Sequence, residues 1–218
     1  MTTETQVRIV NARPDHAPFI AWTMLTAARS HLDTGMWDLV TGWPESETLR
    51  YLEALCTTER MHFTHYSLYL VAEVDGRPAA ALSGYVESEN GTHTLIEAMQ
   101  EVDRAMGRTE AEFAAGWMRA GSIVNVNPPH DPANWVVEHV ATHPDFRRQG
   151  LIDRLLAAIV ERGRERGATT ADVGVLMGND RAQRAYEKAG FEVVWEKTDP
   201  AFESAYKCPG IRLLLRAI

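Results

Sequence analysis

The apolar positions in the last third of the chain switch repeatedly between the spacing of a strand and that of a helix. Short apolar runs predict strands over four segments, Trp135–Thr142, Thr169–Met177, Phe191–Glu196 and Tyr206–Leu215. Apolar residues at helical spacing predict helices over Gly150–Arg166 and Asn179–Ala189, the second of them closed by Gly190. Because strands and helices alternate here, this region predicts a sheet covered by helices.

The residues of the N-terminal half predict one strand followed by two helices. A strand is expected over Gln6–Val10, a helix from Arg13-Pro14-Asp15 to Arg29, and another helix over Pro44–Cys56. In the second helix, leucines recur at helical spacing and two glutamates lie near the N-terminal end, where the helix dipole favours negative charge.

A hairpin follows these helices. Ser67–Val74 and Arg77–Val86 are apolar and rich in strand-forming residues, and Asp75-Gly76 between them suits a two-residue turn of the primed type. An early hairpin followed by alternating strands and helices predicts an α+β fold, with a sheet between helices on both faces.

Residues 88–134 interrupt this pattern. Thr92–Met106 and Thr109–Met118 predict helices with mixed faces, and residues 127–132 form a proline-rich connection. Since proline lacks the N–H that a central strand must donate, this connection is not expected to join the sheet. We interpret 88–134 as a helical insertion in a single domain that covers residues 1–218.

The composition excludes several classes of protein. The 218 residues are 45% hydrophobic and 24% charged, which is typical of a globular chain and not of a disordered one. A net charge of −8 argues against binding to nucleic acid. Cys56 and Cys208 have no metal spacing, so we expect no metal. Without a secretory signal or a run of about 20 apolar residues, the chain is expected to be cytoplasmic and not bound to a membrane.

The segment Arg147–Ile152 carries the main chemical signal, because it joins a predicted strand to a predicted helix. The first N–H groups of a helix have no partner within the helix, and its dipole adds positive charge there. Gly150 lets a phosphate approach the backbone, and Arg147 and Arg148 add charge. The segment predicts a site for a phosphorylated ligand. A solvated basic turn that caps the helix is the alternative.

The same segment, together with residues 140–146 and 179–191, resembles the GNAT acetyltransferase superfamily. The loop of that family has the form [RQ]-x-x-G-x-[GA], and its next helix often has the form N-x-x-A-x-x-x-Y-x-x-x-G-F, which Asn179–Phe191 matches. Ile152 departs from the small residue that the family prefers. The resemblance, which is close over 135–197, implies a mixed and largely antiparallel sheet with splayed central strands, and acetyl-CoA as co-substrate.

The resemblance also implies roles for individual residues. Those expected to hold the diphosphate, mainly through backbone N–H groups, are Arg147, Arg148, Gln149, Gly150, Leu151, Ile152 and Asp153. Those expected along the pantetheine arm are Val140, Ala141, Thr142 and Asn179, with the N–H near Val140 polarising the thioester carbonyl. Tyr186 would protonate the departing thiolate. Its alternative role is that of a packed aromatic residue.

Attack on a thioester requires a neutral amine, so a base must remove a proton. Glu138 is our candidate, and strand alternation would place it on the same face as Val140 and Thr142. Water as the base, or Glu138 as a structural carboxylate, remain alternatives. His139 is expected to point to the opposite face and to bond internally.

The expected function is transfer of an acetyl group to a primary amine of a small molecule or peptide by direct attack in a ternary complex. Aromatic residues that could form the acceptor side are Trp22, Trp37, Trp43, Tyr85 and Trp117, with packing in the core as the alternative. A non-catalytic acyl-CoA-binding module and a protein-interaction domain that uses residues 88–134 remain alternatives. The sequence leaves open whether the chain forms a homodimer.

Overall fold

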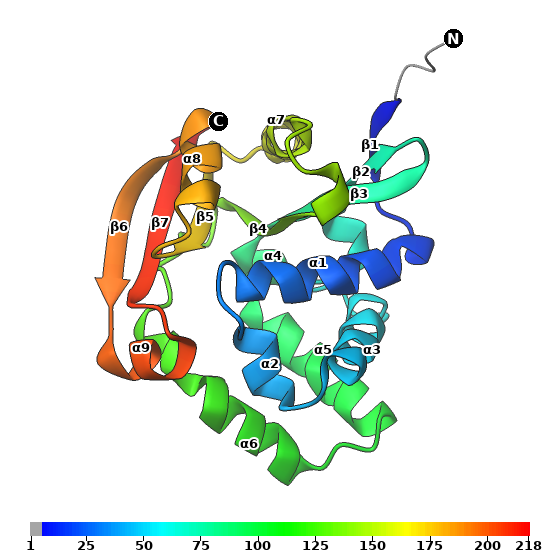
Figure 1. Cartoon of the computed structure of the whole chain (residues 1–218), viewed down its shortest axis with the longest axis vertical. Coiled ribbons are helices and arrows are strands. Elements are labelled where there is room, and N and C mark those ends of the chain that lie inside the picture. The colour runs from blue at the N-terminus through cyan, green and yellow to red at the C-terminus, as the bar shows by residue number, and fades with distance from the viewer. Residues whose placement is uncertain (1–5) are drawn as a thin grey trace.

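The computed structural model describes residues 6–218 and centres on a seven-stranded sheet of order β1-β2-β3-β4-β5-β7-β6 (Figure 1). The strands are β1 (Val7–Asn11), β2 (Tyr69–Val74), β3 (Arg77–Val86), β4 (Trp135–Thr142), β5 (Thr170–Leu176), β6 (Glu192–Thr198) and β7 (Gly210–Ala217). Neighbouring strands are antiparallel except β4 and β5, which pair in parallel. The predicted mixed, largely antiparallel α+β sheet is confirmed. Residues 1–5, which begin the stretch examined for a secretory signal, lie outside the described residues.

Helices cover both faces of this sheet. They are α1 (Ala17–Arg29), α2 (Met36–Thr41), α3 (Glu45–Cys56), α4 (Glu87–Asn90), α5 (Thr92–Ala105), α6 (Glu110–Ala120), α7 (Leu151–Glu165), α8 (Asp180–Lys188) and α9 (Pro200–Tyr206). The predicted helices α1, α3, α5, α6, α7 and α8 are confirmed, with ends that differ by a few residues. Among the helices of the described part of the chain, none is long and apolar enough to cross a membrane.

The alternating side chains of the sheet separate two apolar clusters. Tyr69, Val71 and Ala81 point to one face, where they pack with α1, α3 and α5. Leu70 and Leu82 point to the other face, where they pack with α7. Strand alternation produces this division, and it places the hydrophobic stripe predicted for 150–166 directly on the sheet.

The predicted hairpin is confirmed in its turn as well as in its strands. Asp75 and Gly76 join β2 to β3 with φ angles of 49° and 78°. A primed two-residue turn requires positive φ at both positions, which aspartate tolerates and glycine favours.

The segment between β3 and β4 is helical and reinforces the α1 side of the sheet. Leu95, Met99 and Val102 of α5 are buried in the same cluster as α1 and α3. Thr109 and Glu112 form a reciprocal cap that starts α6, with the Glu112 N–H donating to the Thr109 hydroxyl over 3.2 Å. The proline-rich residues 127–132 contain no strand, as predicted.

Three of these helices, α2, α4 and α9, were not predicted from the sequence. Helix α9 occupies the start of the strand predicted over Tyr206–Leu215, so that β7 begins only at Gly210. The Asp199 carboxylate accepts from the Phe202 N–H over 2.8 Å, and Phe202 stacks on Tyr206 with 4.4 Å between ring centroids. This prediction was wrong because the apolar run includes side chains that a short capped helix buries instead.

Candidate active site

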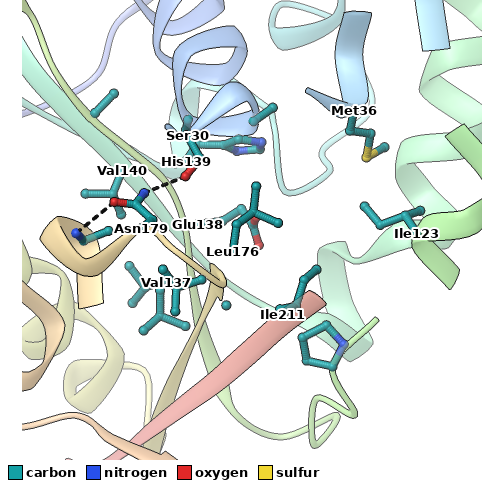
Figure 2. Close-up of a pocket in the computed structure, with 18 of the residues that line it drawn as sticks. Ser30, Met36, Ile123, Val137, Glu138, His139, Val140, Leu176, Asn179 and Ile211 are labelled. Carbon is teal, nitrogen blue, oxygen red and sulfur yellow. Dashed lines mark hydrogen bonds between the residues drawn. The ribbon is translucent and has the colours of Figure 1, made fainter. Parts of the chain in front are cut away.

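The two parallel strands of the sheet separate halfway along their length. Trp135–Val137 pair with Ala171–Val173, and β4 and β5 then diverge. Figure 1 shows the two halves of the sheet turning away from each other at this point. The unpaired remainders, Glu138–Thr142 and Gly174–Leu176, line a cavity of about 480 Å³ (Figure 2). The predicted splayed central strands are therefore present, and backbone groups along both edges of the gap have no ladder partner across it.

A bulge in β4 changes which way its side chains point. The pairing of β3 with β4 slips between Ala81 and Ser83, which leaves one extra residue in β4 near His139. His139 has a φ of 52°, in the left-handed region. Val137 and Val140 both pack on the α7 side, although strict alternation would place them on opposite faces.

The bulge corrects one prediction about Glu138. Val140 lies on the α7 face, and Thr142 pairs with Ala80 of that face. Glu138 therefore shares a face with neither residue, although strict alternation had led us to expect that it would. Glu138 and Val140 still border the cavity (Figure 2), as do Ala141 and Thr142. A slip of this kind depends on pairing with β3, which the periodicity of β4 alone does not reveal.

His139 bonds internally, as predicted, but the prediction that it points to the face opposite Glu138 was wrong. Its contact with Tyr69 places it on the α1 side of the sheet, which Glu138 also faces because of the bulge. The His139 Nδ1 lies 2.9 Å from the Tyr69 hydroxyl, and its ring stacks on Phe63 with 5.8 Å between centroids. Burial lowers the pKa of His139 to about 3, so the imidazole is neutral. This contact fixes the bulge next to Glu138.

The loop before α7 presents unpaired N–H groups at one end of the cavity. Arg148 and Gly150 have φ angles of 64° and 72°, and Gly150 begins the helix without a side-chain cap. Successive N–H groups in such a turn form an anion-binding concavity. Arg147 and Ile152 border the cavity, whereas Arg148, Gln149 and Gly150 are exposed beside it.

Two other residues of this loop and helix have structural contacts. Leu151 is buried in the α7 cluster, so its side chain holds the helix on the sheet. The Asp153 carboxylate accepts from the Lys188 ammonium over 2.6 Å, which ties α7 to α8. The backbone N–H groups of both residues belong to the first turn of α7, where no helical partner exists for them.

Helix α8 brings Asn179 and Tyr186 to the other side of the gap. The Asn179 amide oxygen accepts from the Ala182 N–H over 3.1 Å, and its amide nitrogen donates to the Ser30 hydroxyl at the end of α1 (Figure 2). Tyr186 is buried and borders the cavity. Burial first, and the charge of Glu138 second, raise the pKa of Tyr186, so its phenol remains protonated at neutral pH.

Glu138 has an ionisation suited to proton transfer. Burial raises its pKa to about 7; the charge of His130 opposes this rise, and those of Asp172 and Glu87 add to it. A base with a pKa close to the working pH combines a useful ionised fraction with useful basicity.

Aromatic side chains line much of the cavity. Besides Tyr186, the Phe, Tyr and Trp residues that border it are Trp37, Phe63, Tyr85, Trp117, Phe202 and Tyr206. Trp37, Tyr85 and Trp117 were predicted. Trp22 instead lies against Phe19 and His143, and Trp43 against Tyr51 and Arg108. Phe63, Phe202 and Tyr206 were missed because only the fold brings their segments to the cavity.

The acetyltransferase (GNAT) family model matches residues 32–191, which is most of the chain and includes β4, the loop before α7 and α8. The chain belongs to the GNAT family. A search of curated proteins finds no match.

Solved structures share the fold of this GNAT protein over nearly its whole length. An N-acetyltransferase from Staphylococcus aureus Mu50 is 21% identical, with a TM-score of 0.71 over 95% of this chain and 99% of that one. An acetyltransferase structure is 18% identical, with a TM-score of 0.70 over 97% and 99% of the two chains. A Salmonella typhimurium protein solved with its cofactor acetyl-CoA is 15% identical, with a TM-score of 0.57 over 97% and 93%.

Other chemical groups of the GNAT protein fall outside the predicted set. Glu87 and His130 border the cavity, and Asp172 lies next to it in hydrogen-bond contact with His130. Cys56 and Cys208 are buried free thiols that do not border the cavity. Among residues 6–218, no group of three or more His, Cys, Asp or Glu side chains is arranged to hold a metal ion.

Proposed function

We propose that this GNAT protein moves the acetyl group of acetyl-CoA to a primary amine of a small molecule or peptide, by direct attack in a ternary complex. The observation that carries the proposal is the gap between β4 and β5, which has unpaired N–H groups at one end and Glu138 along its wall. This arrangement can bind a long phosphorylated ligand and remove a proton beside it.

The loop and the strand edge have the chemistry that coenzyme A requires. The N–H groups from Arg148 to Asp153 would bind the diphosphate, with Arg147 adding charge. The unpaired edge at Val140, Ala141 and Thr142 would accept the amide groups of the pantetheine arm as a further strand would, with Asn179 opposite.

Glu138 would remove the proton of the acceptor amine, directly or through one water. Its raised pKa of about 7 makes it a stronger base than an ordinary carboxylate. An amine bound as an ammonium ion next to this carboxylate would lose its proton to Glu138 and then attack the thioester carbonyl. The N–H near Val140 would stabilise the negative charge that forms on the carbonyl oxygen.

Tyr186 would return a proton to the departing sulfur. Because burial keeps its phenol protonated, the hydroxyl can donate to a thiolate that forms beside it. No covalent intermediate is needed: the thiol of Cys56, whose pKa burial raises to about 12, lies away from the cavity, as does that of Cys208. Intact mass spectrometry with acetyl-CoA alone should show no stable acetyl adduct, and such an adduct would contradict direct attack.

A thiol-release assay with acetyl-CoA tests the proposal against a panel of alkylamines, arylalkylamines, amino acids, polyamines and peptides. We expect release of the coenzyme A thiol with at least one amine. In the wild type, kcat/KM should fall at low pH as Glu138 is protonated; this acidic limb of the pH profile should be absent in Glu138→Gln. Glu192→Gln, on the exposed strand β6, is the matched control and should keep that limb. Tight binding of acetyl-CoA with only background release across the panel would favour a non-catalytic acyl-CoA-binding protein.

A further inference from the structure

The proline-rich connection before β4 passes along the cavity and brings a histidine into it. Asn127, Pro128 and His130 border the cavity. The His130 N–H donates to the Pro128 carbonyl over 3.0 Å, which forms a tight turn. The neighbouring prolines restrict the backbone, so the turn holds His130 at a defined place.

Two hydrogen bonds to Asp172 orient this carboxylate and, through it, the His130 side chain. Its Nδ1 lies 2.8 Å from one oxygen of Asp172, and the Asn134 amide donates to the other oxygen over 2.9 Å. Asp172 has no exposed surface. With Nδ1 directed to the carboxylate, Nε2 is the free ring nitrogen, as in other histidines oriented by a carboxylate.

The register of the sheet places Asp172, and with it His130, beside Glu138. Asp172 of β5 is the pairing partner of Val136 in β4, the last pair but one before the strands diverge. Glu138 follows Val136 by two residues, before the bulge, so both side chains point to the same face. Asp172 and Glu138 are therefore diagonal neighbours where the gap opens, and His130 lies in contact with Asp172.

We propose that His130, held by Asp172 and Asn134, is a positioning residue for proton removal by Glu138: its imidazolium charge keeps the neighbouring carboxylate in its basic form. The inference rests on the proposed role of Glu138 as the base. The inference also assigns a function to the connection between α6 and β4, because that connection contains His130.

The charged groups around His130 and Glu138 are consistent with this positioning role of His130. Burial lowers the pKa of His130, but its hydrogen bond to Asp172 and the charges of Asp172, Glu138 and Glu87 outweigh burial and raise it. His130 is therefore charged at a higher pH than an ordinary histidine. The charge of His130 lowers the pKa of Glu138, whereas burial and the two other carboxylates raise it.

Four other titratable groups close to Glu138, all within residues 6–218, carry no charge near neutral pH. His139 is neutral because burial lowers its pKa to about 3. The phenols of Tyr69, Tyr85 and Tyr186 stay protonated because burial raises the pKa of each. Removing the charge of His130 would thus leave Glu138 facing Asp172 and Glu87 without compensation.

A titration of Glu138 tests the inference without an acceptor. The protein is labelled with ¹³C at the glutamate carboxyl carbon, and the Glu138 signal is identified by its loss in Glu138→Gln. In His130→Gln, an amide can still bond to Asp172 and hold the connection. We expect the midpoint of the Glu138 titration to rise by about one pH unit, a tenfold change in proton affinity. An unchanged midpoint would overturn the inference.

The control is His93→Gln, an exposed histidine of α5 outside the cavity, which should leave the midpoint unchanged. With an amine that is acetylated, the acidic limb of kcat/KM should move to higher pH by the same amount in His130→Gln. A loss of thermal stability in His130→Gln without either shift would show that the histidine only fastens the connection. A shifted midpoint with no acetylation of any amine would contradict the proposed function and still support the electrostatic coupling.

Discussion

At the scale of single residues, Tyr186 borders the cavity. Within residues 6–218 its hydroxyl has no hydrogen-bond partner, so no hydrogen bond assigns this group a structural role. Its ring packs on Phe191, with 6.4 Å between centroids. Packing and proton donation are therefore carried by different parts of the same side chain, and the hydroxyl can be removed without removing the ring.

The substitution Tyr186→Phe separates the two parts. We expect kcat to fall on the order of 10²-fold, the lower end of the usual contribution of a general acid, with the KM for acetyl-CoA nearly unchanged. Thermal unfolding should change little because no hydrogen bond is lost. Steady-state kinetics with an accepted amine measures the first effect, and a rate equal to the wild type would remove Tyr186 from the mechanism.

Gly150 tests the anion-binding loop at one position. Its φ of 72° disfavours any side chain, although a Cβ there would meet only the Asp153 carboxylate, at an ordinary contact distance of 4.0 Å. Gly150→Ala should cost about 1 kcal/mol of unfolding free energy and should weaken coenzyme A binding as the loop shifts.

Gly167→Ala is the matched control for Gly150→Ala. Its φ is 85°, a Cβ there meets no atom within 4 Å, and it follows the far end of α7. Calorimetry with coenzyme A should show weaker binding for Gly150→Ala only. Equal affinities in the two variants would argue against the loop as the diphosphate site.

At the scale of elements, α8 shows how one residue can start a helix and also join two parts of the molecule. Asn179 caps α8 through its oxygen and reaches Ser30 at the end of α1 through its nitrogen. The N-x-x-A-x-x-x-Y pattern predicted the helix, and the cap confirms its start. The bridge to Ser30 spans distant segments, which local spacing cannot predict.

Variants at these two residues separate the cap from the bridge. Asn179→Ala should cost about 1 kcal/mol for the lost cap and should raise the KM for acetyl-CoA, whereas Ser30→Ala removes only the bridge. Thr109→Ala removes a cap of the same kind from α6 and should leave that KM unchanged. Denaturant unfolding and kinetics measure the two effects. A similar KM in all three variants would show that Asn179 acts only as a cap.

At the scale of the whole molecule, folding places the Glu138 carboxylate in the cavity, where its charged form is less stable than in water. Glu138 has a pKa of about 7 in the folded protein and an ordinary value near 4.5 when unfolded. The folded state therefore holds its proton more strongly, and stability from this group is lost as pH rises from about 4.5 through about 7.

The substitution Glu138→Gln should reveal how much stability the wild type loses when Glu138 ionises in the folded state. Its unfolding free energy, relative to that of the wild type, should increase between pH 5 and pH 8 by roughly 2 kcal/mol. Urea unfolding at the two pH values measures the difference. Glu192→Gln is again the control. If the difference in unfolding free energy between Glu138→Gln and the wild type does not grow with pH, burial does not raise the pKa of Glu138.

The sequence by itself determined the hairpin, the long helix α7, the strand β4 and the loop and helix motifs, because each depends on local spacing, turn chemistry or capping. Tertiary structure alone decided the bulge at His139, the meeting of His130 with Asp172, and which aromatic residues reach the cavity. These features arise from the register between strands and from the packing of segments far apart in the chain, which local periodicity does not encode.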